Sequence, residues 1–420
     1  MKSGREQRLW ALASTYSLEI LIGACALCAL VFELYAVCYI PQYTIADWLI
    51  NYSQGFVRRG LVGQVVLLAA RPLHMPPPIM VCLVQLIVYG IFLRGVYILA
   101  KPLRRDILWY ALMFSPATLT FPITNVAMGI RKEVLMHMFL VCTIFLIRRK
   151  MPAVALSLYI TAFLGTLVLS HETLACCFPY FFAAVAIGAG NLVSPLKIMA
   201  APLAMAAVLE NIARKHIGTL SVSMGICRSV GGRWVGANDS HNLCAGAIGH
   251  ISWTIEMYRK EELENLHYWP LYAMGAVLAL APLVTALVVM YRRDRLRFEV
   301  KVIATIATLC ALLSVPLFYL AIDWGRWIYM QTICLLLLIL MAAQHAKGFL
   351  RESKAPPLGE GKRWRIPLLA ALVLCYSVWT LPVVGLSPQR YGYFDIPRAL
   401  YANYESGKHQ LRWDQIDRGF

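Results

Sequence analysis

The sequence predicts an all-α, polytopic membrane protein of about eleven transmembrane helices, with an interfacial helix and one larger loop on the outer side. The 420 residues are 60% hydrophobic and 15% charged, and the mean hydropathy is +0.63. This composition is too apolar for a soluble protein of this length. Apolar runs of about 20 residues, enough to cross roughly 30 Å of hydrocarbon as a helix, recur along the chain between basic groups.

The first apolar run, from about Leu18 to Ile40, predicts a helix that enters the membrane from the cytoplasm. It follows Lys2, Arg5 and Arg8, and cationic segments tend to stay on the cytoplasmic side. The run is too long for a cleaved signal peptide, so we interpret it as an anchor. The other predicted helices extend over residues 78–100, 107–124, 133–147, 152–170, 173–190, 196–211, 269–290, 302–322, 327–345 and 366–384.

The basic groups between these helices determine the expected orientation. The odd number of helices leaves the C-terminus outside, so we expect a multi-pass protein of the bacterial inner membrane with a periplasmic C-terminus. The net charge of +17 then reflects cationic loops that face anionic lipid headgroups, and no motif indicates nucleic-acid binding. The groups expected in the cytoplasm are those at 101–105, 148–150, 197, 292–301 and 347–365.

Residues 1–384 form one transmembrane domain in this interpretation, because no repeat or low-complexity segment divides them. The first outer loop, 41–77, contains one weakly apolar piece, Gly60–Ala70, which is too short to span and suits an interfacial helix. The larger outer loop, 212–268, is expected to be a small ordered subdomain. The extracytoplasmic tail, 385–420, is rich in tyrosine and is expected to pack on the membrane surface, with a solvated tail as the alternative.

The cysteines indicate a disulfide rather than a metal centre. Of the twelve cysteines, Cys227 and Cys244 are the two outside the predicted helices, and in an oxidising periplasm they can form a disulfide. The others behave as small hydrophobic residues. No Cys or His group has metal-site spacing, so no cofactor is certain, although a divalent metal remains possible.

Asp47 lies just after the first predicted helix, close to the membrane interface and in partly apolar surroundings. A carboxylate in such a place is expected to have a raised pKa and can act as a general base towards a hydroxyl. A helix N-cap, or a partner for Arg58 or Arg59, is the alternative interpretation. The two interpretations are compatible, because an arginine partner would hold the base in position.

Arg58 and Arg59 follow a polar turn in the same loop and are expected to bind a phosphate or pyrophosphate. A guanidinium group binds phosphate oxygens in a bidentate fashion. The alternative is that these side chains snorkel to lipid headgroups.

Two further charged groups stand at the outer ends of predicted helices. Arg131, Lys132 and Glu133 form three consecutive charges at a helix boundary. Burying such charges in a membrane protein is costly, so we interpret them as functional. A structural ion pair is the alternative. His171 and Glu172 lie between two long apolar runs. An ionisable pair there is a functional candidate, although His171 alone could be a packing residue.

The segment from Asp323 to Trp327 is the densest of these signals. An acid and a base stand three residues apart, Asp323 and Arg326, and Trp324 and Trp327 flank the glycine and arginine between them. Tryptophan is favoured both at membrane interfaces and at sugar-binding surfaces, because its ring stacks while its N–H bonds a polar group. An interfacial belt explains the tryptophans but not the two charges.

An inside N-terminus, a first helix and then a carboxylate in the first outer loop, before a short interfacial helix, resemble the C-type (GT-C) membrane glycosyltransferases. That resemblance implies a polyprenyl-linked sugar donor and a catalytic acid at the position of Asp47. The family often has paired acids in this loop, whereas Asp47 has no second carboxylate before Arg58. The basic outer loops are also similar to Wzy-type polysaccharide polymerases and O-antigen ligases, whose arginines hold lipid pyrophosphates.

We therefore expect a glycosyltransferase that acts outside the cytoplasm in envelope polysaccharide or glycan synthesis, on a polyprenyl-linked donor and a glycan or lipid-linked acceptor. Asp47 would be the base. A transporter for an anionic lipid-linked sugar is the main alternative; it predicts midplane charges, broken helices and an internal repeat. A structural subunit is expected instead if the outer charges pair only with one another. The expected phosphate-binding residues are Arg58, Arg59, Arg131, Lys132 and Arg326, and the expected substrate-binding or orienting residues are Glu133, His171, Glu172, Asp323 and Trp324.

Overall fold

The computed structural model describes most of the chain. Within the described part, the protein is helical and contains no β-strand. The predicted tail, 385–420, and much of the predicted outer loop after residue 232 lie outside the described residues. The described ranges are 2–39, 43–103, 107–124, 130–232, 243–244, 246–254, 256–258, 268–292, 296–320, 323–345 and 365–381.

Eight of the described helices are long and apolar enough to cross a membrane, which confirms the predicted all-α polytopic membrane architecture. Each coincides with one of the predicted spans. They are α1 (Lys2–Tyr39), α4 (Pro77–Ala100), α9 (Ala153–Ser170), α10 (Pro179–Ala189) with the preceding 3-10 helix η1 (Glu172–Cys177), α11 (Val193–Lys215), α14 (Trp269–Tyr291), α15 (Arg297–Leu320) and α16 (Trp324–His345).

The other predicted spans differ from long apolar helices. Helix α8 (Glu133–Arg148) has 16 residues, a length of about 24 Å, and packs inside the bundle against α4 and α10. Helix α17 (Arg365–Val378) has 14 residues. The predicted helix over 107–124 is wrong as a continuous element, because only its ends are α-helical, as α5 (Ile107–Met113) and α6 (Phe121–Thr124).

The break in 107–124 has a local chemical cause. Pro116 lacks a backbone N–H and disfavours helical geometry at the residue before it. Threonine hydroxyls then supply alternative bonds: Thr118 donates to the carbonyls of Leu112 and Ser115, and Thr120 donates to Ser115. Such side-chain bonds to the backbone compete with helix formation.

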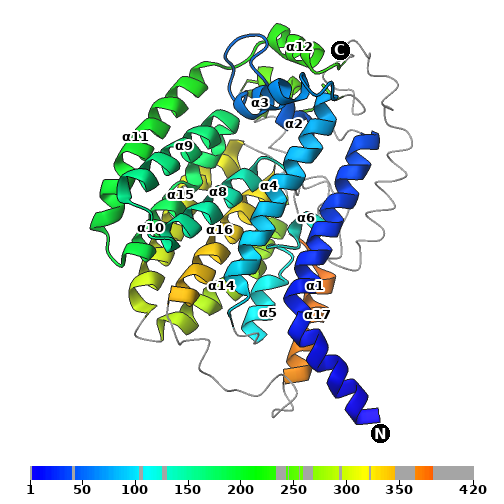
Figure 1. The fold of residues 1–420 in the computed structure, drawn as a ribbon, viewed down its shortest axis with the longest axis vertical. Coiled ribbons are helices and arrows are strands. Elements are labelled where there is room, and N and C mark those ends of the chain that lie inside the picture. The colour runs from blue at the N-terminus through cyan, green and yellow to red at the C-terminus, as the bar shows by residue number, and fades with distance from the viewer. Residues whose placement is uncertain are drawn as a thin grey trace.

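Helix α16 forms the centre of the bundle. It packs against α14, α15, α8, α10 and α4, and Figure 1 shows it surrounded by these helices. Its apolar window is 89% buried, compared with 22% for α11 on the periphery. The exposed side chains of the outer helices are largely aliphatic, as expected for surfaces that face lipid rather than water.

Short elements gather at the end of the bundle opposite the N-terminus of α1 (Figure 1), which we call the loop end. They are α2 (Ala46–Leu49), α3 (Leu61–Ala70), α12 (Leu220–Ser229) and η2 (Gly249–Ser252). Helix α3 is the predicted short apolar helix, and Val65 and Leu68 project from it, exposed. A Cβ at Gly63 would stand 2.0 Å from the carbonyl oxygen of Ile50, so glycine allows α3 to lie directly on the chain that leaves α2.

Candidate functional site

The four acid–base groups predicted from the sequence come together in one place at the loop end. They arrive from the first loop, from the turn before α8, from the end of α9 and from the start of α16. Most of their side chains are buried. We call the following set the charge cluster: Asp47, Arg58, Arg59, Arg131, Lys132, Glu133, Glu172, Asp323 and Arg326.

Glu172 is held by the first loop. The Arg59 guanidinium grips its carboxylate in a forked arrangement, with Nε 2.9 Å from Oε2 and Nη2 2.6 Å from Oε1. Arg58 Nη1 lies 3.6 Å from the same Oε1. A forked, buried arginine–carboxylate pair is among the stronger charge-assisted contacts in proteins, and this pair ties the first loop to the end of α9.

Arg326 joins two further carboxylates of the cluster. It donates to Glu133 at the start of α8 and to Asp323 just before α16. Arg131 lies on the other side of Asp323, with Nη1 3.4 Å from Oδ2. These contacts link α8 to α16 across 193 residues of sequence separation.

Lys132 is the innermost cation. Its ammonium donates to the carbonyl oxygens of Arg59 and Ser170, each at 3.0 Å, and lies 3.7 Å from Asp47 Oδ1. The side chains of both Lys132 and Asp47 are 0% exposed. Lys132 is therefore directed at protein groups in this conformation, and it joins the first loop, α9 and α2.

Asp47 differs from the other carboxylates of the charge cluster because neither of its oxygens accepts a hydrogen bond from any described residue. Burial acts to raise the pKa of Asp47, but Lys132, Arg131, Arg59 and Arg326 outweigh it and hold the pKa below its ordinary value. The raised pKa expected from the sequence is therefore wrong, because the neighbouring cations could not be placed from the sequence. Asp47 is a buried, ionised carboxylate with unused acceptor capacity.

The charge cluster has a sealed inner layer and a partly accessible outer layer. Lys132, Asp47 and Glu133 are sealed, whereas Arg58 is 15% exposed, Arg59 21% and Asp323 17%.

The cluster contains five cations and four carboxylates, which leaves a surplus of one positive charge. Burial lowers the pKa of Lys132 to about 8 against the opposing effect of Asp47, so Lys132 is mostly protonated at neutral pH.

The polar turn before the arginine pair is fixed by local bonds. The Asn51 side chain accepts from Ser53 N at 2.9 Å and donates to Leu49 O at 2.9 Å, and Tyr52 N donates to the Gln64 side chain on α3. Arg59 then adopts a φ of 68°, an uncommon conformation for a residue with a Cβ. Its bonds to Glu172 and Lys132 hold it in that conformation.

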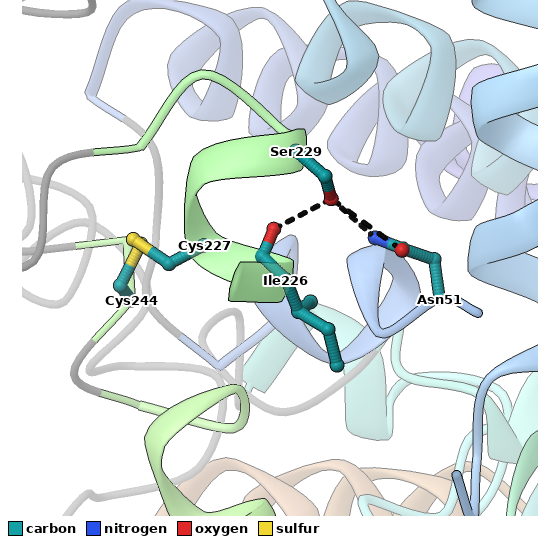
Figure 2. The surroundings of a disulfide bond; sticks show 5 residues. All are labelled: Asn51, Ile226, Cys227, Ser229 and Cys244. Atoms are coloured by element: carbon teal, nitrogen blue, oxygen red, sulfur yellow. Dashed lines mark hydrogen bonds between the residues drawn. A yellow bond between two sulfur atoms is a disulfide. The ribbon is translucent and has the colours of Figure 1, made fainter. Parts of the chain in front are cut away.

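The larger loop covers this turn from outside. Arg58 donates its backbone N–H to His216 O and its side chain to Ile251 O. Figure 2 shows Ser229 on α12 bonded to the Asn51 side chain, at 3.0 Å from Nδ2, beside the disulfide between Cys227 and Cys244. The disulfide expected from the sequence thus connects α12 to the segment that leads to η2.

Two predicted residues take packing positions at the edge of the cluster. The imidazole of His171 is buried, and its Nδ1 lies 2.7 Å from Thr173 Oγ1; burial and the surrounding cations hold the pKa of His171 well below its ordinary range. Trp324 packs among aromatic side chains, with its ring 5.0 Å from Tyr272 and 5.7 Å from Phe318 between centroids.

The sequence interpretation missed an aromatic group next to the cluster. Tyr43 precedes α2, and His250, Trp253 and Tyr258 come from the larger loop. The Arg131 guanidinium lies 5.8 Å from the Tyr43 ring centroid. The sequence feature that could have revealed this group is the concentration of aromatic side chains in residues 250–258. A single sequence does not show that these side chains lie beside residue 43.

The chemistry available to this site is that of anion binding and proton acceptance. Arginine side chains at its accessible layer can exchange a carboxylate partner for a phosphate, and Asp47 can accept a proton from a hydroxyl. Among the described residues, no group of His, Cys, Asp and Glu side chains has the arrangement of a metal site. No family model, no curated protein and no solved structure matches this chain.

Proposed function

We propose that the protein is an integral membrane glycosyltransferase that uses a polyprenyl-(pyro)phosphate-linked sugar at the periplasmic face of the inner membrane. The observation that carries the proposal is the composition of the charge cluster. It combines a surplus of positive charge with an ionised, buried carboxylate that no described group bonds. The positive charge can stabilise a leaving phosphate, and the carboxylate can accept the proton of an attacking hydroxyl.

In this proposal the donor phosphate binds at the accessible layer. Arg58 and Arg59 exchange Glu172 for phosphate oxygens, and Arg131 contributes from the opposite side of the site. Fixed cations next to a departing phosphate stabilise the charge that develops on it in the transition state. Arg326 and Lys132, which are buried and paired, hold Glu133 and Asp47 in place rather than meet the lipid.

Asp47 acts in this scheme as the base that takes the proton of the acceptor hydroxyl as the hydroxyl attacks the anomeric carbon. The side chain is sealed in this structure, so substrate must first part the ion pairs above it. Phosphate competition for the guanidinium groups supplies a cause for that opening. A base that stays ionised at neutral pH suits the role, because no prior deprotonation is needed.

Two observations support a periplasmic loop end. Disulfides persist in oxidising compartments, and Cys227–Cys244 lies at this end. Exposed cations, including Lys101, Lys150 and Lys197, stand at the opposite end of α4, α8 and α11, where the positive-inside rule expects the cytoplasm.

Each competing function has one observation in its favour. Glu133, Glu172 and Asp323 are all paired with arginines, as a purely structural network would be. The interrupted segment 107–124 is the broken helix that a transporter of lipid-linked sugars would have. Neither alternative accounts for a carboxylate, that of Asp47, which lies beside Lys132 but accepts no hydrogen bond from any described residue. The charges of the cluster also lie at one end of the bundle rather than at its middle.

The test is sugar transfer from a panel of undecaprenyl-phosphate and undecaprenyl-pyrophosphate donors by purified protein in nanodiscs, with a parallel assay of lipid-linked sugar movement across liposomes. We expect transfer by wild type and its loss in Arg59→Ala, with Lys197→Ala as the matched control from the opposite end. Movement of lipid-linked sugar without transfer would support a transporter. Neither activity with any donor would support a structural subunit or polymerase partner and contradict the proposal.

A further inference from the structure

Four rings at the loop end form a connected group, which we call the aromatic platform: Tyr43, His250, Trp253 and Tyr258. The imidazole of His250 lies 3.7 Å from the Trp253 ring between centroids, and Trp253 lies 5.3 Å from Tyr258. Tyr43 closes the group 5.7 Å from His250. None of the four has a role in the proposed reaction so far.

The platform is rigidly supported from below. The Tyr258 hydroxyl donates to the His250 carbonyl at 2.9 Å, which fixes the turn between them. Ile248 and Ile251 beside them are buried, and the Ile251 carbonyl accepts from Arg58. The backbone of this segment is therefore anchored to the first loop.

All four residues are partly exposed. This distinguishes them from Trp48 and Trp327, which are buried in the core. They also differ from Trp269, which is 60% exposed at the start of the apolar helix α14, the usual place for an interfacial tryptophan. Three of its rings, His250, Trp253 and Tyr258, belong to a loop segment that follows a disulfide, and not to the end of a spanning helix.

The platform borders the charge cluster. The Arg131 guanidinium stacks on Tyr43 at 5.8 Å and also pairs with Asp323. Arg131, Asp323 and Arg59 all act electrostatically on His250. Asp323 is the most exposed of the four carboxylates in the cluster. A ligand that stacks on the rings would therefore have the Asp323 carboxylate and the Arg131 guanidinium at its edge.

A pyranose ring has the chemistry that these groups together would recognise. Its C–H face is apolar and stacks on an aromatic ring, and its hydroxyls donate to carboxylates and accept from guanidinium groups. We propose that the aromatic platform binds a pyranose ring of the glycan substrate, with Asp323 and Arg131 on its hydroxyls. This inference rests on the proposed function for the identity of the substrate, but the binding itself needs no donor lipid.

The test is saturation-transfer NMR on the full-length protein in nanodiscs, free of alkyl glycoside detergents, with methyl glycosides of common hexoses as probes. We expect saturation transfer to at least one methyl glycoside with wild type, and a reduction of roughly fivefold in Trp253→Ala, since aromatic contacts contribute at this scale. Trp269→Ala is the control and should leave the signal unchanged. Tyr43→Leu, at the other end of the platform, should weaken the signal independently if Trp253→Ala does not fold.

The results separate this inference from the proposed function. The inference is overturned if no methyl glycoside gives a saturation-transfer signal, or if wild type, Trp253→Ala and Tyr43→Leu give equal signals. Either result overturns it even if sugar transfer from a lipid-linked donor is observed. A signal that depends on Trp253 supports the platform even if no transfer occurs, in which case it is the proposed transferase that fails.

Discussion

Replacing Lys132 by methionine should destabilise the protein strongly, because the ammonium is the innermost cation of the charge cluster. The substitution leaves the carbonyl oxygens of Arg59 and Ser170 without their donor and Asp47 without its nearest cation. Removing one partner of a buried ion pair costs about 3–5 kcal/mol. For 420 residues the unfolding entropy is about 0.9 kcal/mol/K, which converts this loss to a fall in Tm of roughly 3–6 °C.

The assay is thermal unfolding in nanodiscs, monitored by intrinsic fluorescence, for Lys132→Met, Asp47→Asn and the double variant. Because Asp47→Asn removes the uncompensated charge, the double variant should recover part of the loss, with a coupling of about 1–3 kcal/mol. The matched control is Lys197→Met, an exposed lysine at the opposite end, which should change stability by less than about 0.5 kcal/mol. Equal Tm values for Lys132→Met and Lys197→Met would refute the argument.

Three further predictions follow from the same geometry. Cys227→Ser should cost about 3 kcal/mol, because the disulfide closes a short loop with a sequence separation of 17; a Tm unchanged from wild type would show that the bond contributes nothing. Stability should fall as pH drops below 6.5, because folding holds the pKa of His250 at about 4 and the unfolded chain therefore binds the proton first. His250→Gln should flatten that slope by up to about 1.4 kcal/mol per pH unit, and an identical slope in urea-monitored unfolding would contradict it. Transfer should decline above about pH 8, where folded Lys132 loses its proton. Lys132→Arg should move that decline to higher pH in a kcat/KM profile, and coincident profiles would exclude Lys132 as its origin.

The helices were predictable because their signal is local. Long apolar runs and the cations between them indicated the eight helices of the described part that are long and apolar enough to cross a membrane. The segment 107–124 was not predictable by the same reasoning, because its apolar composition includes two prolines and three threonines whose hydroxyls donate to backbone carbonyls. Hydropathy measures the environment of such a segment and not its hydrogen bonding.

The members of the charge cluster were predictable, but their partners were not. A charge at a helix boundary is conspicuous in the sequence, whereas the pairing of Arg59 with Glu172 joins residues 113 positions apart and depends on how α3 lies on α9. The direction of the Asp47 pKa failed for the same reason. Burial alone raises the pKa of a carboxyl group, and only the four surrounding cations reverse the sign.

The most direct test of the central claim is the rate of sugar transfer by Asp47→Asn protein, measured beside its binding of the same undecaprenyl-linked donor. Asparagine keeps the size of the side chain and removes the proton acceptor. The proposed mechanism predicts that transfer falls by about 10²–10⁴ in protein that remains folded and binds the donor as wild type does. Transfer at the wild-type rate by folded Asp47→Asn protein would contradict the assignment of Asp47 as the base.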